Sequence, residues 1–97
     1  MQFPASATMT GLDLRDYCNA EKGTQKFQVC LAYIVGVMDS YANKALVKAD
    51  FFCVPEVIKG EQIQLIAQKY LDSHPEQLHY VASSLLVEAL GETFPCK

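Results

Sequence analysis

Prolines and glycines break this chain at intervals, and their positions constrain the fold more than any other feature of the sequence. They are Pro4, Pro55, Pro75, Pro95, Gly11, Gly23, Gly36, Gly60 and Gly91. All except Gly36 lie between or at the ends of stretches in which apolar residues recur at helical spacing. Because both residue types disfavour helix interiors, the pattern predicts an all-α fold, a compact bundle of four main helices with short connections.

The length of the chain limits it to one domain. A single hydrophobic core typically serves about 50 to 200 residues, and this chain has 97. Apolar residues make up 51% of it and charged residues 20%, a balance typical of globular domains rather than of disordered chains. We expect residues 1–97 to form a single helical domain in which residues 1–9 are a loose N-terminal segment.

The first two helices have clear start signals. Thr10 followed by Asp13 is typical of a capping box and predicts a first helix over residues 12–20. Thr24 predicts the N-cap of a second helix. This second helix carries a stripe of apolar residues at helical spacing, namely Phe27, Cys30, Leu31, Ile34, Met38, Tyr41 and Ala45.

The opposite face of the second helix carries what we call the small-residue ridge, which consists of Val29, Ala32, Gly36 and Ser40. A helix that is apolar on two faces is expected to be buried on both. The ridge is therefore predicted to pack either under another helix of the same chain or against a second copy of the protein. The second arrangement predicts a homodimer with the ridge as its contact.

Two further helices follow a less regular stretch. The third is predicted over residues 61–72 from its apolar periodicity. Ser73 and Glu76 have capping-box spacing, with Pro75 in what would be the first turn, and they predict the start of a fourth helix that ends near Gly91. The residues expected on its inner face are Leu78, Val81, Ala82, Leu85, Leu86 and Ala89.

Four cysteines, Cys18, Cys30, Cys53 and Cys96, are too widely spaced for a Cys-x-x-Cys zinc site. An even number of cysteines in a small chain favours two disulfides and an oxidising compartment. Three pairings are possible. In an up-down-up-down bundle, the first two cysteines lie at one helix hairpin and the last two at the opposite end. The predicted pairs are therefore Cys18–Cys30 and Cys53–Cys96.

Charge and hydropathy exclude several classes of function. Lys and Arg number 8 against 11 Asp and Glu, so the net charge is −3, which argues against a nucleic-acid partner. No apolar run approaches the roughly 18 residues of a membrane span, so membrane insertion is not expected. No cofactor or metal motif is present. The start of the chain lacks the features of a signal peptide, and with the cysteines this suggests an exported protein whose signal has been removed.

A cysteine paired with a histidine can act as nucleophile and base in catalysis. Cys53 or Cys96 with His74 or His79 are the candidates. No glycine-rich elbow or oxyanion-type motif flanks any of them, and the even cysteine count favours disulfides. A small thiol enzyme therefore remains only an alternative to a binding protein.

Four stretches resemble one known family. They are residues 30–39, with the pattern Cys-x-x-Tyr-Ile-x-Gly-x-x-Asp; residues 53–55, with Cys-x-Pro; residues 70–79, with Tyr-Leu-x-x-His-Pro-Glu-x-Leu-His; and residues 89–96, which end in Phe-Pro-Cys. These sequence motifs are similar to those of the Tai-type immunity proteins. The resemblance extends over roughly residues 18 to 96.

The resemblance implies a function. Tai-type proteins neutralise peptidoglycan amidase effectors of the bacterial type VI secretion system, and they are small, helical, periplasmic and often dimeric. They block the amidase by occupying its substrate groove. The resemblance thus implies a cognate peptidoglycan amidase effector as the partner, no enzymatic activity, and no cofactor. Another small periplasmic helical protein, an acid-stress chaperone, is the alternative within the binding class.

An inhibitor of this kind needs a protruding segment fixed at its base. Residues 43–61 form the longest stretch without helical periodicity, and Cys53 with the flanking phenylalanines can fix it. It also carries charged groups suited to a groove that binds a charged peptide. We expect these residues to bind the partner: Lys44, Lys48, Asp50, Glu56, Lys59 and Glu61.

Overall fold

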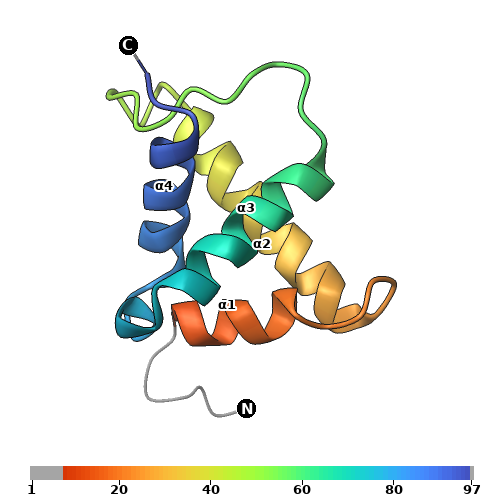
Figure 1. Ribbon diagram of the computed structural model, residues 1–97. Helices are drawn as coiled ribbons and strands as arrows, with labels where there is room; N and C mark the ends of the chain where they lie inside the picture. Colours follow the sequence, from red (N-terminus) through yellow and green to blue (C-terminus); the bar gives the residue numbers. More distant parts are fainter. Residues whose placement is uncertain (1–7, 97) are drawn as a thin grey trace.

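The computed structural model describes residues 8–96 and contains four α-helices, with no strand in that range. They are α1 (Gly11–Cys18), α2 (Gln25–Ala42), α3 (Gly60–Ser73) and α4 (Ala82–Thr93), with a 3₁₀ turn over Pro75–Gln77. Each helix packs against the other three. Figure 1 shows α1 across one end, α2 and α3 crossing one another, and α4 upright beside them. The all-α prediction is confirmed.

All four helices contribute to one hydrophobic core. Its most completely buried large side chains include Leu14 of α1, Leu71 of α3, and Leu86 and Leu90 of α4. From α2 the core receives the predicted stripe, in which Phe27, Cys30 and Ile34 are buried and Leu31, Met38 and Tyr41 are half-buried. Ala45 lies beyond the end of α2 and is exposed, so this member of the stripe was wrongly assigned.

The prediction that α2 is buried on both faces is wrong for the described residues, 8–96, of one chain. Val29 is 38% exposed, and the rest of the small-residue ridge is also exposed. At Gly36 an added Cβ would meet no atom within 4 Å. The reason is geometric: the three other helices enclose one core, and all of them approach α2 from the side of its buried stripe. Within residues 8–96 no other element covers the ridge.

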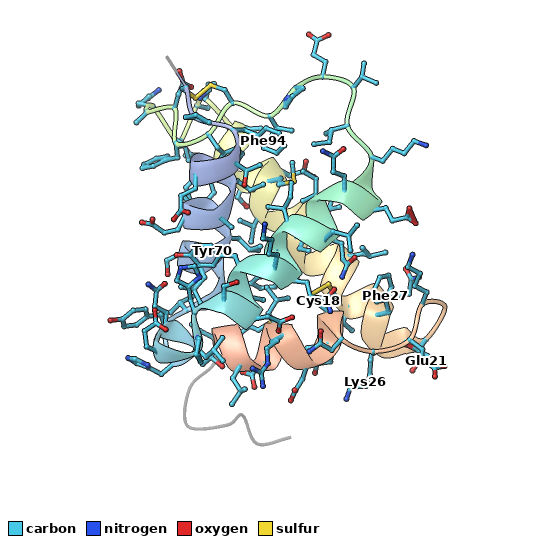
Figure 2. The ribbon with its side chains drawn as sticks, in the orientation of Figure 1. Cys18, Glu21, Lys26, Phe27, Tyr70 and Phe94 are labelled. Atoms are coloured by element: carbon cyan, nitrogen blue, oxygen red, sulfur yellow. A yellow bond between two sulfur atoms is a disulfide. The ribbon has the colours of Figure 1, made fainter. Side chains whose placement is uncertain are left out.

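Both predicted disulfides are present. Cys18 and Cys30 join α1 to α2 with a Cα–Cα distance of 5.0 Å, inside the core. Figure 2 shows Cys18 at this cross-link, between the two helices. Cys53 and Cys96 join the α2–α3 connection to the residues after α4, with a Cα–Cα distance of 5.1 Å.

The predicted caps of α1 and α2 are confirmed. At α1 the Asp13 amide donates to Thr10 Oγ1 at 3.2 Å, and the Thr10 amide donates to the Asp13 carboxylate at 3.1 Å. At α2 the Phe27 amide donates to Thr24 Oγ1 at 3.2 Å. Between the two helices, Gly23 has φ 89°, a left-handed conformation that favours glycine. The start signals in the sequence were therefore reliable for the first two helices.

The predicted start of the fourth helix is wrong. Ser73 is the last residue of α3, and α4 begins eight positions after His74, at Ala82. Pro75 disfavours a helical conformation for the residue before it, and His74 accordingly has φ −127° and ψ 61°. Residues 74–81 form a junction instead, in which Leu78 is buried and Val81 is 40% exposed.

The junction is diverted from helix by its contact with the start of α1. The amides of Gly11 and Leu12 donate to the carbonyls of Tyr80 and Leu78, at 2.9 and 3.0 Å. The first amides of any helix lack partners within that helix, so the junction supplies acceptors that α1 needs. The Ala82 amide also donates to the Met9 carbonyl at 2.8 Å. Of the expected loose N-terminal segment, Met9 is thus held in place, and residues 1–7 lie outside the described range.

This contact requires a glycine at position 11. An added Cβ on Gly11 would lie 2.5 Å from Leu85 Cδ1 and 3.2 Å from the Leu78 Cα. We therefore predict that Gly11→Ala lowers the free energy of unfolding by about 1–3 kcal/mol, because overpacking forces the backbone of the junction to shift. Urea unfolding followed by circular dichroism measures this.

Gly36→Ala is the matched control for this prediction. Gly36 lies inside α2 and its Cβ would meet open space, so alanine should raise the free energy of unfolding by about 0.5–1 kcal/mol. An unchanged unfolding midpoint for Gly11→Ala would contradict the assignment of a close contact between α1 and the junction.

Candidate partner-binding site

Residues 43–59, which we call the 43–59 segment, connect α2 to α3 and pass over one end of the helices (Figure 1). The segment starts in a turn at Asn43, whose carbonyl accepts from the Val47 amide at 2.8 Å and whose side chain accepts from the Ala45 amide at 3.1 Å. Beyond residue 47 it contains no regular structure. Of the predicted range 43–61, only the last two positions are helical, in the first turn of α3.

The middle of the segment is tied to the end of α4. Besides the disulfide to Cys96, the Cys53 amide donates to the Phe94 carbonyl at 2.8 Å. Phe94 lies where α4 ends, close to the segment (Figure 2). The approach is close, since an added Cβ on Gly91 would lie 3.1 Å from the Phe51 carbonyl. This part of the segment therefore has a fixed position relative to α4.

Aromatic and aliphatic side chains fix the segment further. Tyr41, near the end of α2, contacts the ring of Phe51 edge-on at 5.4 Å and the ring of Phe52 at 6.1 Å. Phe52, Val54 and Ile58 are half-buried against the core. The prediction that Cys53 and the flanking phenylalanines fix the segment is confirmed.

Most of the charged residues predicted to bind a partner have contacts within the chain. Lys44 pairs with Asp50, and Lys48 Nζ donates to the Lys44 carbonyl at 3.2 Å. Glu61, in the first turn of α3, pairs with Lys22 at 3.3 Å. These residues are all exposed. Neighbouring charges partly neutralise Lys44, Asp50 and Glu61. Lys48, in contrast, bonds only to a neutral carbonyl and keeps its charge.

Glu56 and Lys59 differ from these four. Both are exposed, and neither forms a hydrogen bond or ion pair between side chains within residues 8–96. They lie close together in what we call the tip, residues 56–59. Of the six residues predicted from sequence, they are the two whose side chains have no hydrogen bond or ion pair within the described residues.

The tip also carries an apolar residue, Val57, that is not among the residues predicted from the sequence to bind the partner. Val57 is 96% exposed, the highest value among the exposed large apolar side chains of the described residues. Charged groups alone were predicted to bind the partner in this stretch, so Val57 was not among them. An aliphatic residue in an irregular, proline-containing stretch outside any helical periodicity was the signal that could have identified it.

The small-residue ridge borders a second exposed feature. Ala32, Tyr33, Gly36, Val37 and Ser40 line a shallow hollow of about 390 Å³ on α2. Ser40 Oγ donates to the Gly36 carbonyl at 2.8 Å, so its hydroxyl is satisfied within the helix. The face is therefore weakly polar and shallowly hollowed, with small side chains at Ala32, Gly36 and Ser40.

The junction, residues 74–81, is held mainly by contacts within the chain. His74 stacks on Tyr70 at 4.0 Å and its Nδ1 lies 2.8 Å from the Tyr70 carbonyl. Tyr70, between α3 and α4 (Figure 2), donates from its hydroxyl to Gln77 at 3.0 Å. Burial raises the pKa of Tyr70, and the negative charges of nearby glutamates raise it further. These contacts are internal, and they account for the junction residues structurally.

The candidate nucleophiles of a thiol enzyme are not free thiols in this structure. Cys53 and Cys96 are joined to one another, and no cysteine of the described residues is free. Residues 8–96 also contain no group of three or more side chains placed to hold a metal ion. None of the helices in this range has the length and apolar character needed to cross a membrane. What the geometry offers is a surface for binding another macromolecule.

The fold and this surface define a class, that of small disulfide-linked helical binding proteins. Comparison with protein families matches residues 10–96 to the Rap1a immunity proteins. This match covers most of the chain, and the protein belongs to that family, whose members are immunity proteins of type VI secretion. A search of curated proteins found no match.

The Cys53–Cys96 disulfide is predicted to control the stability and the position of the segment. It closes a loop with a sequence separation of 43, so replacing both cysteines by alanine should lower the free energy of unfolding by about 4 kcal/mol. Because Cys53 is exposed, the core should survive. We expect native helicity at low temperature but faster proteolysis within residues 43–59.

Cys18→Ala with Cys30→Ala is the matched control. That pair closes a shorter loop, with a sequence separation of 12, worth about 3 kcal/mol by the same estimate, but both sulfurs lie in the core. Its loss should destabilise the helices without exposing the segment selectively. Equal proteolysis of residues 43–59 in both variants would show that the Cys53–Cys96 link does not hold the segment.

Proposed function

We propose that this protein is a periplasmic immunity protein that inhibits a type VI peptidoglycan amidase effector by placing the tip in the amidase substrate groove. The observation that carries the proposal is the tip itself. Glu56, Val57 and Lys59 are exposed at the end of a segment that a disulfide, a backbone hydrogen bond and aromatic contacts with Tyr41 hold in place. Neither charged side chain is paired within residues 8–96.

The physical basis is preorganisation. A flexible loop loses conformational entropy when it binds, and that loss weakens the complex. In this chain the segment has three points of attachment: α2, the end of α4, and α3. An inhibitor built this way needs no catalytic group, only a shape and a charge pattern that fit the groove.

Family membership and the disulfides support the partner and the compartment. Membership of the Rap1a family supports a role as an immunity protein, and the partner of an immunity protein is a secreted effector. The resemblance of residues 30–39 and 70–79 to Tai-type proteins favours a peptidoglycan amidase among such effectors. Two disulfides in a small domain require an oxidising compartment to form, and the periplasm is also where peptidoglycan is attacked.

We predict that Glu56→Arg combined with Lys59→Glu weakens amidase binding by at least about tenfold, roughly 1.4 kcal/mol. The change reverses both available charges of the tip, so complementary contacts in the groove become repulsive. Binding is measured by calorimetry, and inhibition by release of peptide from purified sacculi. Helicity and melting temperature should not change, since neither side chain is paired within the described residues.

Lys44→Asp combined with Asp50→Lys is the matched control, because it reverses two charges in the same segment and keeps them as a pair. It should leave inhibition unchanged. Full inhibition by the Glu56–Lys59 double variant would move the inhibitory surface away from the tip, to the junction as the next candidate.

The small-residue ridge supports a second proposal, that the protein is a homodimer in which α2 of one copy packs on α2 of the other. The ridge is exposed in the single chain, and small side chains allow two helix backbones to approach closely. A two-fold dimer uses the same patch on both copies, and a continuous strip along one helix suits that symmetry.

The dimer is tested by Gly36→Leu. The new side chain would stand in the middle of the contact, while within the chain its Cβ meets open space. We predict a monomer in sedimentation equilibrium, with unchanged helicity. A Gly36→Leu protein that sediments like the wild type would exclude the ridge as the dimer contact.

A further inference from the structure

A groove lies between α2 and the start of α3, beside the tip. Its volume is about 340 Å³. The side chains that line it are mainly apolar: Leu31, Ile34, Val35 and Met38 from α2, and Ile58 and Ile63 from the other side. We call it the α2–α3 groove. Val35, on its wall, is 54% exposed, so apolar surface is open to solvent there.

One carboxylate stands at this groove. Asp39 lines it and is exposed, and its carboxylate forms no hydrogen bond or ion pair within residues 8–96. The motif over residues 30–39 ends at this position, yet the fold gives the carboxylate no structural role. The groove thus offers an apolar recess next to an unpaired negative charge.

The groove and the tip belong to one continuous surface. Ile58 lines the groove while its neighbours in the chain, Val57 and Lys59, are exposed at the tip. Gly60, which follows, also lines the groove. When the tip enters the cleft of a partner protein, the rim of that cleft is brought next to the groove.

We propose that the α2–α3 groove is a second contact with the same amidase, and that it takes an apolar side chain of the cleft rim with a Lys or Arg beside it. The proposal rests on the proposed function and adds to it the chemistry of the partner's surface. Burial of the apolar side chain supplies affinity, and pairing with Asp39 selects the partner.

A second copy of this chain fits the groove less well. In a two-fold contact each residue near the axis faces its own copy. A dimer centred on the groove would bring two Asp39 carboxylates together in an apolar setting, which is unfavourable. The small-residue ridge, on a different strip of α2, carries no charged residue.

Two variants test the groove. Val35→Asp places a negative charge on the apolar wall of the groove, and Asp39→Lys replaces the negative charge at the groove by a positive one. Both positions are exposed, so the fold should be retained, and the melting temperature verifies this. Leu65→Asp is the matched control, because Leu65 is 59% exposed on α3 and does not line the groove. The probe is a purified type VI peptidoglycan amidase that the wild-type protein inhibits.

We expect Val35→Asp and Asp39→Lys each to weaken binding of that amidase by at least tenfold and Leu65→Asp to leave it unchanged. Wild-type affinity for both groove variants, with weakened binding of the Glu56–Lys59 double variant, would overturn the groove contact and leave the proposed function standing. Loss of a wild-type dimer in Val35→Asp with unchanged amidase affinity would assign the groove to a second copy and likewise overturn the proposal. Failure of the wild-type protein to inhibit any of a panel of such amidases would overturn both.

Discussion

The Cys53–Cys96 disulfide, together with the hydrogen bond from the Cys53 amide to the Phe94 carbonyl, constrains the molecule's surface more than any other contact. Without it, a connection as long as residues 43–59 would sample many conformations, and ordering it would cost about 1–2 kcal/mol per residue for the backbone alone. With it, the segment is attached near its middle as well as at both ends. Half-buried Phe52, Val54 and Ile58 then point the neighbouring residues outward.

This attachment also fixes the positions of the charged residues within the segment. Exposed ion pairs such as that of Lys44 and Asp50 contribute little to stability, typically about 0–1 kcal/mol. Their effect on the surface is larger, because a paired charge attracts a partner less than an isolated one. The Lys44–Asp50 pair neutralises two charges of the segment, and Lys48 stays charged at its base. The tip carries one negative group, Glu56, and one positive group, Lys59. Unpaired charges of both signs at the tip penalise a partner whose surface does not carry the opposite charges.

The sequence was sufficient for features with local causes and insufficient for those set by distant contacts. Thr10 with Asp13 and Thr24 predicted the first two helix starts, since a cap involves only neighbouring residues. Ser73 has the same local signal, yet no helix starts there, because the carbonyls of residues 78 and 80 bond to α1 instead. The small-residue ridge showed that α2 is apolar on two faces, but only the packing of the other helices reveals which face remains open. Val57 was missed because exposure is a property of the folded chain.

The three exposed features lie next to one another, and this order limits how a partner can approach. The tip adjoins the α2–α3 groove through Ile58, and the groove adjoins the small-residue ridge along α2, since Val35 lines the groove and Gly36 belongs to the ridge. In the proposed assembly a second copy covers the ridge and the amidase covers the tip and the groove. The two partners then meet along α2 near Asp39. Asp39 lies where both contacts end. Because its carboxylate is unpaired within the described residues, its charge favours a basic amidase rim over a second acidic copy of this chain.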